Sequence, residues 1–152
     1  MEIIYKTTEK KSNFTYCAEL FKNKKPLNGF NKMFERIMWE PVDDDEFEVQ
    51  NVYFDEPIDG VLYLDYPFQV VVKENIHFDS LYSLISEIRR VYKAIYEDEE
   101  KTMKKIVKKN PNIINRGVSD GKYGIWGHVI GDLGIESIRL YEGNLVEVNI
   151  GS

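Results

Sequence analysis

The sequence has few of the residues from which catalytic and metal sites are most often built. Its 152 residues include one cysteine, Cys17, and two histidines, His77 and His128. A single cysteine cannot form a disulfide within the chain, which is typical of a reducing compartment, so we expect a cytoplasmic location. No candidate base lies near Cys17 in the sequence to activate it as a nucleophile.

Long apolar runs are also missing. No segment approaches the roughly 20 apolar residues of a transmembrane helix, and the first residues hold no run like that of a signal peptide. The formal net charge is −6. Such a chain is repelled on average by nucleic-acid phosphates and gains no attraction to anionic membranes, so we expect neither as a partner. The same charge permits steering toward a basic protein.

The remaining composition indicates one globular α+β domain over residues 1–152. Apolar residues make up 43% of the chain, which is enough to bury a substantial core. Alternating apolar and polar residues predict strands. These lie at residues 2–8, 46–54 and 61–72, with a further hairpin at 135–150. Residues 57–60 predict a turn, and Pro67 predicts a bend or a sheet edge.

Helical periodicity appears in two or three places. Residues 14–21 fit either a second strand or a short helix. Apolar residues at the helix period predict a helix over residues 28–39. The strongest helix signal begins at Asp79, a good N-cap, and continues to about Tyr96 with one apolar stripe. It either continues or restarts through residues 97–109 and ends at Asn110-Pro111. We expect this helix to pack on a mostly antiparallel sheet of five or six strands.

Five of the ten glycines fall between Gly121 and Gly134. Apolar residues in this segment follow the helix period, but each interior glycine costs a helix about 1 kcal/mol relative to alanine. We therefore predict a loop with one helical turn, leading into a strand near Leu133. Trp126 is expected in the core and Tyr123 in a half-exposed position.

The candidate catalytic residues also lie in or beside this segment. His128 is a potential general base or metal ligand, oriented by Asp132, with Glu136 or His77 completing the set. The spacing lacks the tight His and Cys patterns of zinc sites, and the acidic run at residues 43–46 lacks that of a calcium loop. We therefore expect no metal and no cofactor. Because a lone histidine is a weak signal for a site, the sequence favours the other interpretation, in which His128 is a partly buried, hydrogen-bonded structural residue.

The segment Tyr-Gly-Ile-Trp-Gly-His at residues 123–128, followed by Asp132-Leu133 and Glu136, resembles a stretch in small uncharacterised bacterial single-domain proteins, some carried on mobile cassettes. A preceding Tyr-Lys-x-Ile-Tyr-x-x-Glu pattern at residues 92–99 belongs to the same resemblance. It covers about the second half of the chain. It implies a compact α+β domain and brings no established activity with it.

Three hypotheses for function follow. The first is a non-enzymatic protein-interaction module of an accessory, stress or immunity type, with Tyr123, Trp126 and Tyr66 as its contact surface and a homodimer as one possible assembly. The second is a small hydrolase that uses His128 with Asp132 and Glu136. The third is a small-ligand carrier whose pocket is lined by Tyr63, Tyr66 and Trp126. The absence of a catalytic motif favours the first.

Overall fold

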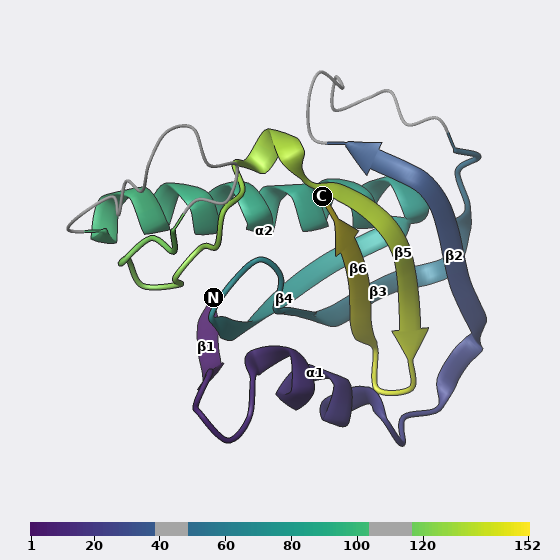
Figure 1. Ribbon diagram of the computed structural model, residues 1–152. Helices are drawn as coiled ribbons and strands as arrows, with labels where there is room; N and C mark the ends of the chain where they lie inside the picture. Colours follow the sequence, from purple (N-terminus) through teal and green to yellow (C-terminus); the bar gives the residue numbers. More distant parts are fainter. Residues whose placement is uncertain (39–48, 104–116) are drawn as a thin grey trace.

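The computed structural model describes residues 1–38, 49–103 and 117–152, and these residues form an α+β fold (Figure 1). The elements, in chain order, are β1 (Glu2–Lys6), α1 (Asn13–Phe21), β2 (Pro26–Met38), β3 (Tyr53–Leu64), β4 (Val70–Ser80), α2 (Leu81–Thr102), the short 3-10 helix η1 (Ile130–Asp132), β5 (Gly134–Tyr141) and β6 (Leu145–Gly151). In the described ranges, no helix is both long and apolar enough to cross a membrane.

The six strands form one sheet in the order β1-β4-β3-β6-β5-β2. Every neighbouring pair is antiparallel except β3 and β6, which run parallel. The predicted fold class, a mostly antiparallel sheet with one long helix and a C-terminal hairpin, is therefore confirmed. Figure 1 shows the sheet curving around the side that α2 occupies.

The main core lies between α2 and the sheet. The predicted apolar stripe of α2 is buried, and it faces alternate residues of β4 such as Val70 and Val72. Burying one such side chain contributes about 1.5 to 3 kcal/mol, so this contact dominates the stability of the fold. The N-cap is Ser80, not the predicted Asp79, because the Ser80 and Ser83 side chains form a reciprocal capping box. The helix continues past Tyr96 to Thr102, and its predicted end at Asn110-Pro111 lies outside the described residues.

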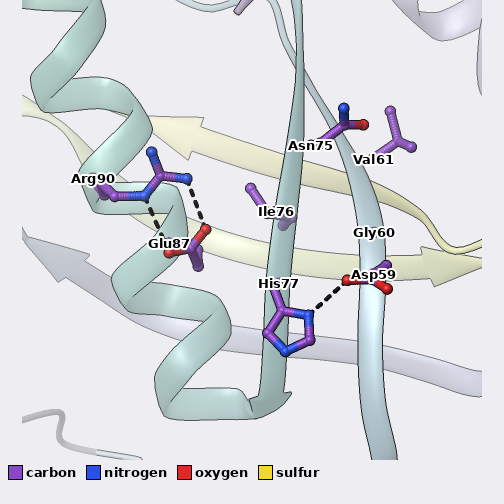
Figure 2. A pocket seen from close by; sticks show the side chains of 8 residues that line it. All are labelled: Asp59, Gly60, Val61, Asn75, Ile76, His77, Glu87 and Arg90. Carbon is purple, nitrogen blue, oxygen red and sulfur yellow. Dashed lines mark hydrogen bonds and ion pairs between the residues drawn. The ribbon is translucent and has the colours of Figure 1, made fainter.

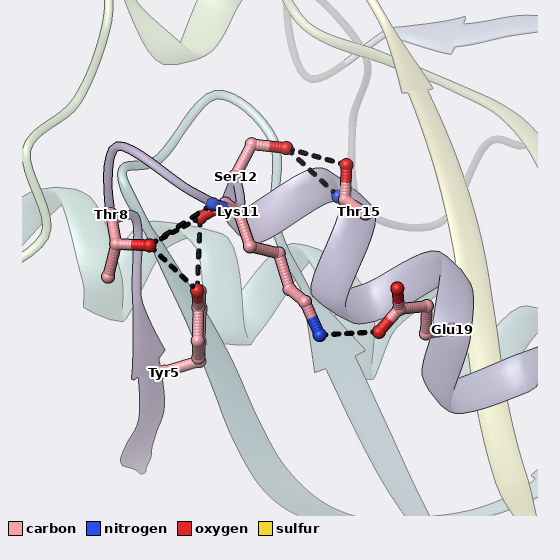
Figure 3. Close-up of polar contacts among 6 residues, drawn as sticks. All are labelled: Tyr5, Thr8, Lys11, Ser12, Thr15 and Glu19. Atoms are coloured by element: carbon pink, nitrogen blue, oxygen red, sulfur yellow. Dashed lines mark hydrogen bonds and ion pairs between the residues drawn. The ribbon is translucent and has the colours of Figure 1, made fainter.

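A smaller core covers the opposite face of the sheet. Residues 14–21, which fit a strand or a helix, belong to α1, whose Cys17 and Phe21 pack on Val71 of β4 and Tyr141 of β5. Figure 3 shows how α1 begins: the Ser12 hydroxyl accepts a hydrogen bond from the Thr15 N–H. In the same view, Lys11 pairs with Glu19 across the first two turns.

The prediction of a helix over residues 28–39 is wrong. Residues 26–38 form β2, an edge strand that pairs with β5 and has two irregularities in its register. The apolar residues here happen to recur at the helix period, but Met33 is 71% exposed. Pairing with β5 therefore decides the structure against the local pattern, as tertiary contacts often do.

The prediction of a turn over residues 57–60 is also wrong, because these residues belong to β3. The ladder between β3 and β4 shifts register between Tyr53 and Ile58, and this irregularity accommodates Pro57. The chain turns instead at residues 65–69, at the predicted bend around Pro67, where the Tyr66–Pro67 peptide is cis. The alternating run 61–72 is thus two strands joined by a turn. The strand predicted at residues 46–54 begins only at Tyr53, and its residues 46–48 lie outside the described residues. The acidic run at residues 43–46 also lies outside them.

The predicted C-terminal hairpin and the predicted loop before it are confirmed. β5 and β6 form the hairpin, and Gly143 and Asn144 at its turn have φ of 84° and 60°. Positive φ at two successive residues is the geometry that matches the twist of paired strands. Residues 117–129 form the expected loop, η1 is its single helical turn, and β5 begins directly after Leu133.

Candidate functional site

Four aromatic rings form a continuous chain near the surface, and we call Phe14, Tyr66, His128 and Trp126 the aromatic surface. The ring centroids of Phe14 and Tyr66 are 6.2 Å apart, those of Tyr66 and His128 5.8 Å, and those of His128 and Trp126 5.3 Å. Phe14 is 44% exposed and Trp126 39% exposed. The rings come from α1, the β3–β4 turn and the loop before η1, so the surface exists only in the folded chain.

Hydrogen bonds fix the centre of the aromatic surface. The Tyr66 hydroxyl lies 3.0 Å from His128 Nε2 and 2.9 Å from Ser152 Oγ. The backbone N–H of Trp126 donates to the Pro67 carbonyl at 2.8 Å, which ties the loop to the β3–β4 turn. The Tyr96 hydroxyl donates to the His128 carbonyl at 3.0 Å, which ties the same loop to α2. The rings are therefore held before any partner arrives.

Glu99 of α2 anchors the loop that carries Trp126 and His128. Its side chain is buried, with 3% of the residue exposed. Its carboxylate accepts the N–H groups of Tyr123 at 2.8 Å, Gly124 at 3.1 Å and Ile125 at 3.3 Å, together with the Ser119 hydroxyl. The loop backbone comes so close that a Cβ at Gly121 would overlap this carboxylate. The chain thus uses a buried anion to satisfy loop amides that no strand or helix pairs.

Asn13 plays the corresponding role for α1 and the β3–β4 turn. It is 1% exposed, and its Nδ2 donates to the carbonyls of Asp65 at 2.8 Å, Phe68 at 2.8 Å and Val70 at 3.1 Å. Its Oδ1 accepts the Thr7 hydroxyl at 2.7 Å. Because Asn13 precedes Phe14 and Asp65 precedes Tyr66, these bonds set the positions of both rings.

Tyr123 and Trp126 differ in burial from the prediction, which placed Trp126 in the core and Tyr123 in a half-exposed position. Tyr123 is 1% exposed and donates its hydroxyl to Asp98 at 2.8 Å, whereas Trp126 lies at the surface. The backbone of Tyr123 is held on both sides, by Glu99 at its N–H and by the Gln69 N–H at its carbonyl. This double attachment turns the Tyr123 ring toward Phe68 in the core, so Tyr123 cannot contribute to a contact surface.

A groove of about 730 Å³ adjoins the aromatic surface, between the last turns of α2 and the loop. Its described lining includes the apolar side chains of Met103, Val118, Ile125, Val129 and Ile130 and the exposed carboxylates of Glu97, Glu100 and Asp132. Burial raises the pKa of the Tyr96 hydroxyl in this groove, and the nearby Asp132 carboxylate raises it further. The small-ligand carrier hypothesis predicted a pocket lined by Tyr63, Tyr66 and Trp126. None of these three residues belongs to the described lining of this groove.

His128 and Asp132 both line this groove, and Glu136, on β5, is not part of its described lining. The segment is not a helix, so the four-residue spacing of these side chains does not align them on one face. The hydrogen bond that the structure gives His128 Nε2 is to Tyr66. Among residues 1–38, 49–103 and 117–152, no group of three or more His, Cys, Asp or Glu is placed to hold a metal ion.

His77 lies in a separate hollow of about 480 Å³ between β3, β4 and α2. Figure 2 shows its ring turned toward Asp59 on the neighbouring strand, with Nδ1 2.6 Å from Oδ1. Arg90 in the same view is turned toward Glu87 of its own helix. Both members of the His77–Asp59 pair are exposed, and the residues that line this hollow do not line the groove beside His128.

Sequence reasoning found three of the four rings and missed Phe14, Asn13 and Glu99. Glu99 had a signal: it continues the buried stripe of Tyr92 and Ile95 at helix spacing, where a carboxylate needs partners. Asn13 had none, because the three carbonyls to which its Nδ2 donates lie more than fifty residues away in the sequence. No protein-family model matches the chain, and searches of the curated proteins and of the solved structures return no match.

Asp65 gives the fold a testable pH dependence. Burial raises the pKa of its carboxyl to about 6. This folded-state pKa lies above the ordinary value, so the folded chain keeps the proton to higher pH, and the contribution of Asp65 to the free energy of unfolding falls as pH rises from about 4 to about 6. In Asp65→Asn, most of this pH-dependent fall should disappear. At neutral pH, the free energy of unfolding of this variant should exceed that of the wild type by on the order of 2 kcal/mol.

Urea unfolding followed by far-ultraviolet circular dichroism across this pH range measures the effect. The exposed Asp55→Asn serves as the matched control, since it removes the same charge from the surface. An unchanged pH profile in Asp65→Asn would contradict the assignment.

Proposed function

We propose that this chain is a non-enzymatic protein-interaction module that contacts its partner through the aromatic surface. The observation that supports this most is the exposure of Phe14 and Trp126 on a rigid support. Aromatic side chains usually fill the core, whereas here buried Asn13 and Glu99 hold the segments that carry these two rings at the surface. Pre-positioned aromatic anchors are the residues that dominate the binding energy of protein interfaces.

The charge of the chain favours a basic partner. With a net charge of −6, the chain attracts cationic proteins over distances comparable to the Debye length. The contacts at His128 do not favour hydrolysis, because its ring Nε2 is already hydrogen-bonded to the Tyr66 hydroxyl. A second copy of the chain remains one possible partner, and the experiment below includes it.

Trp126→Ala is expected to weaken partner binding by about 30-fold or more, which is the usual effect of removing a central aromatic anchor. The measurement is affinity capture from the source cells with the purified chain as bait. It is followed by isothermal titration of the captured partner, and sedimentation equilibrium tests self-association. Tyr53→Ala is the matched control, because Tyr53 is an exposed aromatic residue outside the aromatic surface.

The proposal requires a partner, or a dimer, that wild type and Tyr53→Ala bind equally and that Trp126→Ala binds weakly. A partner bound equally by all three variants would place the interface elsewhere. The absence of any partner or dimer would remove the proposed function itself.

A further inference from the structure

The groove beside the aromatic surface has an apolar floor that continues into that surface. His128 belongs to both, and Val129, next to it, is exposed within the groove. At about 730 Å³ the groove is larger than one side chain, and hollows of this size hold ligands of drug or short-peptide dimensions. A partner that covers Trp126 would therefore also cover this groove.

The charged side chains in the described lining of the groove have one sign. Glu97, Glu100 and Asp132 are exposed in its lining, and none of the three forms an ion pair with a described residue. The buried Glu99 carboxylate is already occupied by loop N–H groups. No lysine or arginine belongs to the described part of the lining. A concave site with charges of one sign concentrates ligands of the opposite sign.

We propose that this groove binds a segment of the partner protein in which lysine or arginine side chains flank an apolar side chain. The inference rests on the proposed function and specifies the chemistry of the partner. The apolar side chain removes the floor, Met103, Ile125 and Val129, from water, while the cations lie against the carboxylates at the rim. An anionic or purely polar segment would leave the floor uncovered or meet three like charges, so the groove selects against both.

The first test uses short synthetic peptides rather than the unidentified partner. One peptide has a lysine-leucine-lysine centre between glycine and serine residues, a second has glutamate-leucine-glutamate, and a third has lysine-serine-lysine. Nuclear magnetic resonance titration of the labelled full chain gives both the binding site and the affinity. We expect the first peptide to shift the amide resonances of Met103, Ser119 and Val129, and to bind roughly tenfold more tightly than either of the others.

The second test removes the rim charges without disturbing the fold. Glu100→Gln with Asp132→Asn is expected to weaken binding of the lysine-leucine-lysine peptide by about tenfold, since each exposed charge pair contributes about threefold. Glu9→Gln with Asp55→Asn is the control, because it changes the net charge equally at exposed positions outside the groove lining. Equal weakening in both double variants would mean that overall charge alone attracts the peptide, and would overturn the proposal.

Two further results separate this inference from the proposed function. If the captured partner is lost with Trp126→Ala but binds the rim variant as tightly as wild type, the interaction module stands and the cationic segment does not. If spermidine binds the groove as tightly as the peptide, a small polyamine rather than a protein segment is the ligand.

Discussion

Replacing Glu99 with alanine is expected to lower the free energy of unfolding by about 3 kcal/mol or more, because several buried donors lose their acceptor together. The N–H groups of Tyr123, Gly124 and Ile125 all point at this carboxylate, and so does the Ser119 hydroxyl. Water that enters the space left by the side chain recovers part of the loss, which is why the expected value lies below the sum of separate bonds. Chemical unfolding at neutral pH measures it.

Two further variants make this result specific. Glu99→Gln keeps the shape of the side chain but points an amide donor at loop donors, so we expect a loss of about 2 kcal/mol. Glu97→Ala, in the same helix and exposed, should stay within about 0.5 kcal/mol of wild type. If Glu99→Ala behaved like Glu97→Ala, the loop would not depend on the buried carboxylate.

The Glu99 variants also separate support of the aromatic surface from contact with the partner. Glu99 is buried and touches the loop backbone, so a partner seated on Trp126 cannot reach its carboxylate. We expect partner affinity to fall in Glu99→Gln because Trp126 and His128 lose their fixed positions. Faster hydrogen exchange at the amides of Tyr123 and Ile125 should accompany this loss, whereas Trp126→Ala should leave that exchange unchanged.

Local signals were sufficient for the elements whose contacts are near in sequence. The apolar stripe of α2 repeats over several turns, and a long periodic pattern leaves few alternatives. The β5–β6 hairpin has two alternating runs around Gly143 and Asn144, which tolerate the positive φ of its turn. The glycines of the loop at residues 117–129 argued against a long helix, because each interior glycine costs a helix about 1 kcal/mol relative to alanine. In each case the deciding interaction lies within a few residues.

Elements fixed by distant partners could not be predicted in the same way. β2 has helical periodicity, but it is a strand because β5, about a hundred residues later, pairs with it. The positions of Tyr123 and Trp126 depend on Glu99, Gln69 and Pro67, which are distant in the chain. Residue type alone does not decide which of these two aromatic rings is buried. The candidate site was found through its residue types, but its geometry needed the fold.

The second large effect is expected at Asn13. Asn13→Ala removes the donor that the carbonyls of Asp65, Phe68 and Val70 share, and should lower the free energy of unfolding by about 3 kcal/mol. Asn13→Asp should be more destabilising, because it directs a buried negative charge at the same carbonyl oxygens. Asn23→Ala is the control at an exposed position just after α1. Urea unfolding of the four proteins measures the series.

The Asn13 variants also test whether the aromatic surface is assembled from separately anchored parts. Asn13 fixes Phe14 and Tyr66, and Glu99 fixes the loop with Trp126 and His128, while the Tyr66–His128 contact joins the two halves. If that contact couples the halves, the destabilisation in Asn13→Ala combined with Glu99→Gln should be less than the sum of the single effects, by about 0.5 kcal/mol or more. Strict additivity would mean that the halves are independent. A partner would then have to bring Tyr66 and His128 together, and binding energy would be spent on ordering the surface.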